Sequence, residues 1–244
     1  MAIIDSSTWY RNKDTGWTNV RGSDTLGFGS GYELVWAERN EKRIRGSGVS
    51  INNLGFWRTE GALSADGVIY QIEMVLPKNS TVIAEISLSP LAGLQGLTAP
   101  SFLFRSSVPD FKLLDSNGAI VSGGTTISQV LGATKYTLKF KINSDGTLTG
   151  YYSLGSTLNA EIGTTTLANN LLDKALYLSA QATLIDPAGA FISFDNYYVH
   201  DEGLNFVVPE PSDLDLDTFS FGLKDMYPED QTHMGGIYEK KWKK

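Results

Sequence analysis

Asp195 and Asn196 are adjacent polar residues in a segment, 191–199, that is otherwise rich in aromatic and β-branched side chains. Ca²⁺ and other hard cations bind carboxylate and amide oxygens, which makes this pair a candidate metal site. The same short signal is also typical of side chains that cap a loop at the edge of a sheet. The sequence leaves both interpretations open, and it indicates no cofactor other than Ca²⁺.

Four aromatic residues are candidates for binding a sugar: Trp36, Trp57, Tyr151 and Tyr197. Flat aromatic rings pack well against the apolar faces of sugar rings. Tyr151 and Tyr197 are the stronger candidates, because neighbouring aromatic residues such as Tyr152 and Tyr198 occupy the alternate positions, which we expect to face the core. In the alternative interpretation, most of the four fill the core or the space under loops.

The sequence offers little for nucleophilic or zinc chemistry. It contains no cysteine, which excludes disulfides, thiol catalysis and thiolate metal sites. His200 and His233 are isolated, without the His-x-x-x-His spacing of zinc sites or a Ser-His-Asp order. We therefore assign no catalytic residue from these patterns.

Strands must position the candidate side chains, because apolar and polar residues alternate along most of the chain. Residues 135–142 alternate strictly, and Asp145-Gly146 supplies the positive φ of a tight turn, which predicts a hairpin with 148–154. Residues 69–76 and 82–88 also alternate, and the turn residues 77–80 between them predict a second hairpin. Shorter strands between 102 and 130 predict a meander, and helix is confined to short candidates at 91–97 and 167–174.

Three regions follow from this pattern. Residues 1–30 mix aromatic side chains with glycines and predict an N-terminal arm or edge strand. Residues 31–208 predict the β-sandwich, with two long strands at 176–184 and 190–199 in or near the middle of a sheet. Residues 209–244 lose the alternation and predict an extended C-terminal tail. The predicted fold class is an all-β, antiparallel jelly-roll β-sandwich with extended arms at both ends.

Charge and hydropathy argue against several partners. A net charge of −7 opposes a general affinity for nucleic acid. No apolar run approaches the length of about 18 residues that a membrane-spanning helix needs. The first residues also lack the basic and apolar blocks of a signal peptide, so we expect synthesis in the cytoplasm without one.

The order of strands and turns resembles a concanavalin-A-like lectin or glucanase domain over residues 30–200. The resemblance rests on the Asp-Gly hairpin, on 150–156 and on the closing strand 191–199. It implies two curved antiparallel sheets with a concave face that holds a saccharide in many members. Glycosidases of this family carry carboxylates at alternating positions of one strand, about 5 Å apart. Glu73 and Glu85 each stand alone in apolar strands, so we expect that the protein is not an enzyme.

Three functional hypotheses follow. The leading one is a non-enzymatic structural and adhesion protein of a larger assembly, preferably a bacteriophage virion or tail component. Its terminal arms would contact other subunits, and we expect a homo-oligomer located in the virion or outside the cell after assembly. The first alternative is a free carbohydrate-binding lectin module. The second alternative is a glycoside hydrolase or lyase, which needs two opposed carboxylates, one with a raised pKa.

Overall fold

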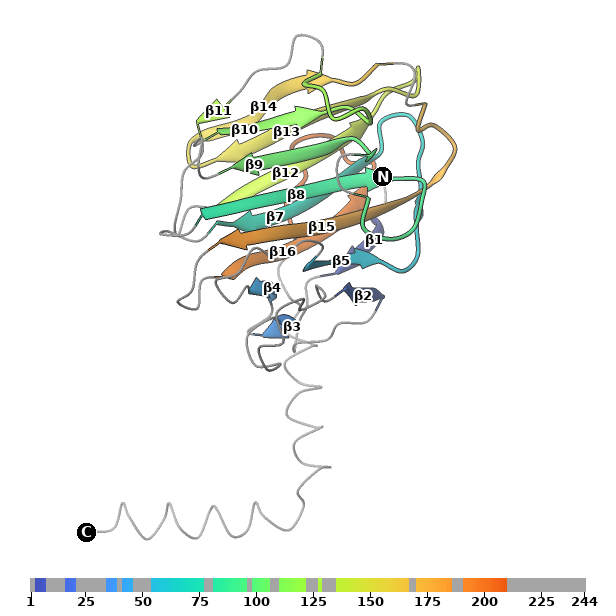
Figure 1. Cartoon of the computed structure of the whole chain (residues 1–244). Coiled ribbons are helices and arrows are strands. Elements are labelled where there is room, and N and C mark those ends of the chain that lie inside the picture. Colours follow the sequence, from blue (N-terminus) through green and yellow to red (C-terminus); the bar gives the residue numbers. More distant parts are fainter. Residues whose placement is uncertain are drawn as a thin grey trace, which may run out of the picture. The chain divides into compact units, whose positions relative to one another are not determined.

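The computed structural model of the chain describes residues 3–7, 16–20, 34–38, 41–45, 54–76, 81–95, 98–105, 110–121, 127–128, 135–166, 170–185 and 191–209. These residues form two antiparallel β-sheets of eight strands each, and no α-helix occurs among them (Figure 1). The chain divides into two compact units, Met1–Phe206 and Val207–Lys244, and both sheets belong to the first. The predicted all-β antiparallel sandwich is therefore confirmed.

The first sheet is centred on β7, which lies between β12 and β16. Its strand order is β14 (Thr157–Thr164), β13 (Leu148–Leu154), β12 (Lys135–Ile142), β7 (Ile69–Val75), β16 (Phe191–His200), β4 (Glu41–Arg45) and β3 (Leu34–Glu38). A further strand, β1 (Ile3–Ser7), pairs with the C-terminal half of β16.

The second sheet is centred on β8, which lies between β9 and β15. Its strand order is β11 (Ile127–Ser128), β10 (Asp110–Leu114), β9 (Ser101–Arg105), β8 (Thr81–Ser89), β15 (Ala175–Ile185), β5 (Leu54–Arg58) and β2 (Trp17–Val20). The short strand β6 (Ala62–Leu63) also pairs with β15. Strands β8 to β11 are neighbours in chain order, which confirms the predicted meander.

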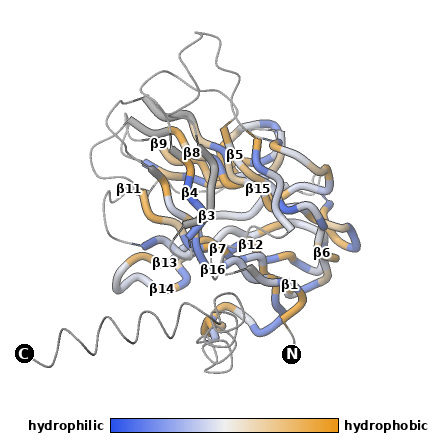
Figure 2. Tube along the Cα trace, turned by 90° about the horizontal axis from the view of Figure 1, so that it is seen from below, coloured by the Kyte–Doolittle hydropathy of each residue, from blue (hydrophilic) through white to orange (hydrophobic). Residues whose placement is uncertain are grey.

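The hairpin predicted at Asp145-Gly146 joins β12 to β13. Gly146 has a φ of 81°, and the Asp145 carboxylate accepts hydrogen bonds from the backbone N–H and the hydroxyl of Thr147. Hydrophobic and hydrophilic residues alternate along the strands of both sheets (Figure 2). In β12 this alternation turns Tyr136 and Phe140 toward the core, as the sequence predicts.

The second predicted hairpin, between residues 69–76 and 82–88, is wrong. β7 pairs with β12 and β16 in the first sheet, whereas β8 pairs with β9 and β15 in the second. The chain therefore passes from one sheet to the other after Leu76. Each strand has a buried apolar face and can place it against the core from either sheet, so its alternation does not reveal its partner.

The hydrophobic core lies between the sheets and is rich in aromatic rings. Phe104 stacks on Phe111 with ring centroids 4.9 Å apart, and Tyr136 packs edge-on against both at 5.4 Å. Burial of a large apolar side chain contributes about 1.5–3 kcal/mol, and an aromatic pair adds about 0.5–1.5 kcal/mol. These rings join strands β9, β10 and β12, and so hold the two sheets together.

An ion pair also links the sheets at the N-terminal end. Arg58 of β5 donates from Nη2 and Nε to the two carboxylate oxygens of Asp5 of β1, at 2.6 and 2.9 Å. The guanidinium also lies over the rings of Trp17 and Tyr197, 5.4 and 5.7 Å from their centroids. β1 and β2 therefore belong to the sandwich, with β2 at the edge of the second sheet, and the assignment of residues 1–30 to an N-terminal arm or edge strand stays a prediction.

Other predictions concern segments with little described structure. Residues 91–95 and 170–174, parts of the two helix candidates, form bends, turns and irregular backbone. Residues 210–244, nearly all of the predicted C-terminal tail, lie outside the described residues. The described part of the chain contains no helix with the length and apolar character of a membrane-spanning segment.

Candidate functional site

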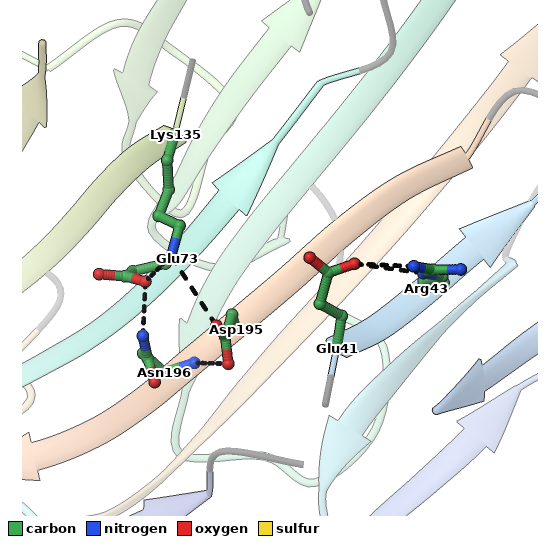
Figure 3. A network of polar contacts seen from close by, with 6 residues as sticks. All are labelled: Glu41, Arg43, Glu73, Lys135, Asp195 and Asn196. Carbon is green, nitrogen blue, oxygen red and sulfur yellow. Dashed lines mark hydrogen bonds and ion pairs between the residues drawn. The ribbon is translucent and has the colours of Figure 1, made fainter. Parts of the chain in front are cut away.

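A cluster of charged and polar side chains lies on the outer face of the first sheet, away from the core. It consists of residues from four strands: Glu41, Arg43, Glu73, Lys135, Asp195 and Asn196 (Figure 3). Of these, Glu41, Glu73, Lys135 and Asp195 line a small depression in the surface. A depression of this kind can contact part of a ligand that lies along the surface but cannot enclose one, since pockets that enclose small molecules are usually about 300–1,000 Å³.

Two carboxylates face each other at the centre of this cluster. Glu73 of β7 and Asp195 of β16 are direct cross-strand partners. The Lys135 Nζ atom lies 2.7 Å from Glu73 Oε2 and 3.8 Å from Asp195 Oδ2, so one ammonium group contacts both acids. Glu73 Oε2 also accepts a 2.7 Å hydrogen bond from the side-chain amide of Asn196. Contacts with Lys135 and Asn196 therefore hold the two carboxylates close together.

A β-bulge in β16 places Asn196 on the same face as Asp195. The pairing of β16 with β7 shifts register between Asp195 and Tyr198, and Asn196 has a φ of 50°. An extra residue in a strand changes which side chains face outward beyond it. Asp195 faces outward with Glu73 through the ordinary alternation that follows the core residue Phe194, whereas beyond the bulge Tyr197 turns into the core. The Asp195 carboxylate also accepts a hydrogen bond from the backbone N–H of Asn196, at 2.8 Å.

The environment of Asp195 favours its protonated form. Burial raises the pKa of Asp195 to about 6, with further contributions from Glu73 and Glu41, while the Asn196 backbone hydrogen bond and Lys135 oppose the shift. The side chain of Asp195 is 27% exposed and that of Glu73 is 13% exposed. Burial also lowers the pKa of Lys135, but the hydrogen bond and charge of Glu73 and the charges of Asp195 and Glu41 outweigh it, and the pKa is raised. The site thus combines an acid that is half protonated near pH 6 with a carboxylate that accepts hydrogen bonds.

The four predicted ligand-binding aromatics do not lie together. Tyr151 is half-buried on the outer face of the first sheet, opposite Lys139. Trp57 lies in the second sheet, where its ring packs 6.2 Å from that of Tyr177. Trp36 lies in β3 opposite Arg43, and its side chain is outside the described set.

Tyr197 corrects the orientation expected from the sequence. Its side chain is fully buried and packs edge-on against Trp17 at 5.2 Å. The bulge at Asn196 reverses the alternation, so Tyr198 takes the outward position that the sequence pattern assigned to Tyr197. A fully buried ring cannot stack on a sugar, and Tyr197 is therefore not part of the site.

The predicted metal pair, Asp195 and Asn196, lies within the cluster. The carboxylate oxygens of Asp195 contact the Lys135 ammonium group and the backbone N–H of Asn196. The side-chain amide of Asn196 donates a hydrogen bond to Glu73. Within the described ranges, no group of three or more His, Cys, Asp or Glu side chains is arranged to hold a metal. The contacts of the pair are those of an ion-pair network, so binding of Ca²⁺ stays a prediction.

Sequence analysis missed the pairing of Glu73 with Asp195. The two residues are more than a hundred positions apart, and their proximity depends on the pairing of β7 with β16. The available signal was an acidic residue in each of two apolar strands, which marks positions that face away from the core. That signal identifies candidates, but it does not tell which strands are neighbours.

Several solved structures have folds similar to that of this chain. An endo-acting O-glycanase of the human gut microbiota matches with a TM-score of 0.57 and 12% identity, over 81% of this chain and 98% of that one. The endo-β-1,3-glucanase of Pyrococcus furiosus matches with a TM-score of 0.56 and 11% identity, over 81% and 93%. The globular domain of T. cruzi calreticulin matches with a TM-score of 0.53 and 12% identity, over 97% and 100%.

The fold is that of the concanavalin-A-like domains. This confirms the resemblance expected from the closing strand and the Asp-Gly hairpin. No protein-family model matches the sequence, and no curated protein is similar to it. With identities of 9–12%, the similar enzyme structures establish a concanavalin-A-like fold, and the chemistry must be argued from the residues of this chain.

The same comparisons contradict the leading functional hypothesis. Most of these concanavalin-A-like structures are glycan-hydrolysing enzymes, including a laminarinase from Flavobacterium sp. UMI-01. The expectations of a non-enzymatic structural or adhesion protein of a bacteriophage assembly, and of no enzymatic activity, are therefore wrong. The sequence pattern considered acids at alternating positions of one strand, whereas Glu73 and Asp195 are brought together from two different strands.

Proposed function

We propose that the protein is a glycoside hydrolase whose acidic pair is Glu73 and Asp195. The observation that carries the proposal is the direct pairing of these residues across β7 and β16, with one ammonium group in contact with both. Glycosidases need one carboxylic acid to protonate the leaving oxygen and one carboxylate to attack the sugar or activate water. The cluster supplies both types of group on one accessible face.

Asp195 is the proposed general acid. Its raised pKa, about 6, keeps a substantial fraction protonated in mildly acidic solution. Protonated Asp195 would transfer its proton to the glycosidic oxygen, and the leaving sugar would depart as an alcohol. The activity should therefore fall as the pH rises above about 6, because Asp195 then loses the proton that it donates.

Glu73 is the proposed nucleophile. The Glu73 and Asp195 oxygens lie within 2.7 and 3.8 Å of the same nitrogen atom. This closeness fits the separation of about 5 Å in retaining enzymes better than the larger gap, about 6.5–9.5 Å, that leaves room for water in inverting enzymes. Lys135 is 47% exposed, so its side chain can move to solvent when a sugar enters. Attack by Glu73 would then form a glycosyl–enzyme ester, which water hydrolyses with Asp195 acting as base.

The experiment is a reducing-end assay with the purified full chain on a panel of polysaccharides that includes a β-1,3-glucan, mucin O-glycans and polygalacturonate. We expect Glu73→Gln and Asp195→Asn each to lower kcat about 100-fold or more, the scale of general acid–base and nucleophilic contributions. The matched control is Glu85→Gln, because Glu85 accepts a hydrogen bond from Gln181 in the second sheet, away from the site. The control should retain full activity.

Two results would refute the proposal. Hydrolysis that survives both Glu73→Gln and Asp195→Asn would exclude the acidic pair. Glycan binding without hydrolysis of any substrate would instead favour the alternative of a carbohydrate-binding module. Glycan as a partner, the oligomeric state and the role of residues 209–244 as an arm stay predictions.

A further inference from the structure

The segment that follows β16 returns across the outer face of the first sheet. We call residues 201–206 the strap. The Leu204 carbonyl accepts a hydrogen bond from Lys139 Nζ, and the Asn205 side-chain oxygen accepts one from Asn159 Nδ2 at 2.9 Å. The Phe206 ring stacks on His200 with centroids 4.1 Å apart and packs against Tyr198 at 5.2 Å. The strap is thus fixed through three of its residues, Leu204, Asn205 and Phe206.

Polar side chains are buried at this end of the sheet, where outward-facing residues usually meet water. Gln71 of β7 is 2% exposed, Lys139 of β12 is 4% exposed and His200 of β16 is 0% exposed. Lys139 and Gln71 are direct cross-strand partners, and the strap contacts both Lys139 and His200. Three strands therefore contribute to one row of covered polar groups.

Among the residues that the structure describes, two atoms in this row find no hydrogen-bond partner: Gln71 Oε1 and His200 Nε2. His200 Nδ1 accepts a hydrogen bond from the backbone N–H of Glu202 at 3.3 Å, so the proton of the neutral ring belongs on Nε2. The row therefore holds an imidazole N–H without an acceptor and an amide oxygen without a donor. Buried polar groups are normally paired, so these two atoms need an explanation, and a donor and an acceptor exposed to the same place can bind a polar ligand.

Lys139 adds a positive charge that is in contact with no carboxylate of the described residues. Its two hydrogen-bond partners are Asn159 Oδ1, at 2.8 Å, and the Leu204 carbonyl, and both are uncharged. Lys135, four residues earlier on the same strand, contrasts with it by pairing with Glu73. Desolvation of an ammonium group is costly unless an anion compensates it, and burial lowers the pKa of Lys139 accordingly.

Tyr151 lies directly opposite Lys139 across the β12–β13 pair and faces the same side. An aromatic ring beside an ammonium group suits a sugar that carries a carboxylate, since the ring can contact the sugar and the ammonium can bind the acid. Glu161, the partner of Tyr151 on β14, is exposed, so solvent screens its charge.

We propose that Lys139, His200 and Gln71 form a subsite for a uronic-acid residue of an acidic glycan, which the strap covers in the free protein. The sugar carboxylate accepts hydrogen bonds from Lys139 Nζ and His200 Nε2, and a neighbouring hydroxyl donates to Gln71 Oε1. The Leu204 carbonyl occupies the position of one carboxylate oxygen until the ligand displaces the strap. Lys139 lies about 13 Å along β12 from Lys135, so one extended glycan chain can reach both places.

This inference rests on the proposed function, because it names the substrate class of the same face. The test measures binding by calorimetry with the full chain carrying Glu73→Gln, which prevents hydrolysis. The probes are an oligogalacturonate and its methyl ester, which share one backbone and differ in charge. We expect the acid to bind at least tenfold more tightly than the ester. Equal affinities for the two probes would overturn the subsite.

Two further variants locate the binding site. Lys139→Met should reduce the affinity for the acid to that of the ester, whereas Lys112→Met, on β10 of the second sheet, should leave both unchanged. Phe206→Ala should raise the affinity for the acid several-fold, because it loosens the strap, and Leu158→Ala, a 74% exposed position on β14, should not. An unchanged affinity in Lys139→Met, or a weaker one in a folded Phe206→Ala protein, would contradict the inference.

The two proposals fail in different ways. Selective binding of the acid probe without hydrolysis of any glycan would remove the proposed enzyme and leave the subsite. Hydrolysis of neutral glycans without preference for the acid probe would remove the subsite and leave the enzyme.

Discussion

Two residues should give the stability of the protein opposite pH dependences that nearly cancel. Burial, with a contribution from Lys139, lowers the pKa of His200 to about 4 from its ordinary value of 6.5. The unfolded chain then binds more protons, so stability is lost as the pH falls from 6.5 to 4. Asp195 behaves in the opposite way, because its raised pKa makes stability fall as the pH rises from 3.8 to about 6.

The magnitudes are similar. One pKa unit corresponds to about 1.4 kcal/mol, so the His200 shift amounts to about 3 kcal/mol and the Asp195 shift to about 3 kcal/mol. Between pH 4 and 6 the two contributions oppose each other, and their sum changes little in the wild-type protein. Substituting either residue should therefore reveal the pH dependence of the unfolding free energy that the other residue contributes.

The perturbations are His200→Gln and Asp195→Asn, alone and together. Relative to wild type, Asp195→Asn should gain about 2 kcal/mol of unfolding free energy between pH 4 and 6, and His200→Gln should lose about as much, because this window covers only part of each full shift. The double variant should follow the wild-type curve. Urea unfolding at pH 4, 5, 6 and 7 measures these differences. Slopes of the same sign in the two single variants, or no change in slope in either, would refute the reasoning.

Two further substitutions test the packing of the sandwich. Arg58→Met should lower the unfolding free energy by about 3 kcal/mol at pH 7, because it leaves the Asp5 carboxylate partly buried without its 2.6 Å partner. Adding Asp5→Asn should restore part of this loss. Thermal and urea unfolding of the single and double variants measure both effects. Gly55→Ala should destabilise by more than about 2 kcal/mol, because a Cβ atom at this position would lie 2.3 Å from the Ala180 carbonyl oxygen. A Gly55→Ala protein as stable as the wild type in urea would show that β5 and β15 can separate without cost.

Local chemistry explains which parts of the fold could be predicted from the sequence. The β12–β13 hairpin depends on neighbouring residues, the alternation around Tyr136 and the Asp145-Gly146 turn, and it was correct. The supposed hairpin between β7 and β8 was wrong, because alternation shows that a strand has a buried face but not which strand lies beside it.

In the candidate site as well, the sequence shows which residues face away from the core but not which of them lie side by side. Glu73 and Asp195 were both noticed, one as an isolated acid and the other as a metal ligand, but their contact depends on a pairing between distant strands. Tyr197 was assigned to the wrong face because the bulge at Asn196 interrupts a pattern that the sequence displays as continuous. A single residue with positive φ was enough to exchange the roles of Tyr197 and Tyr198.

The position of the last two strands has a consequence for how the chain is made. β15 and β16 come late in the sequence, yet each lies inside its sheet, between strands from the first 90 residues. A ribosome adds about 5–20 residues per second, so β5 and β8 wait roughly five to twenty seconds for β15, which must pair with both. During that interval their edges are open to other chains. Folding of the nascent protein is therefore a late event, and a truncation before residue 175 would divide each sheet into separate groups of strands and leave β1 and β6 without the strands they pair with.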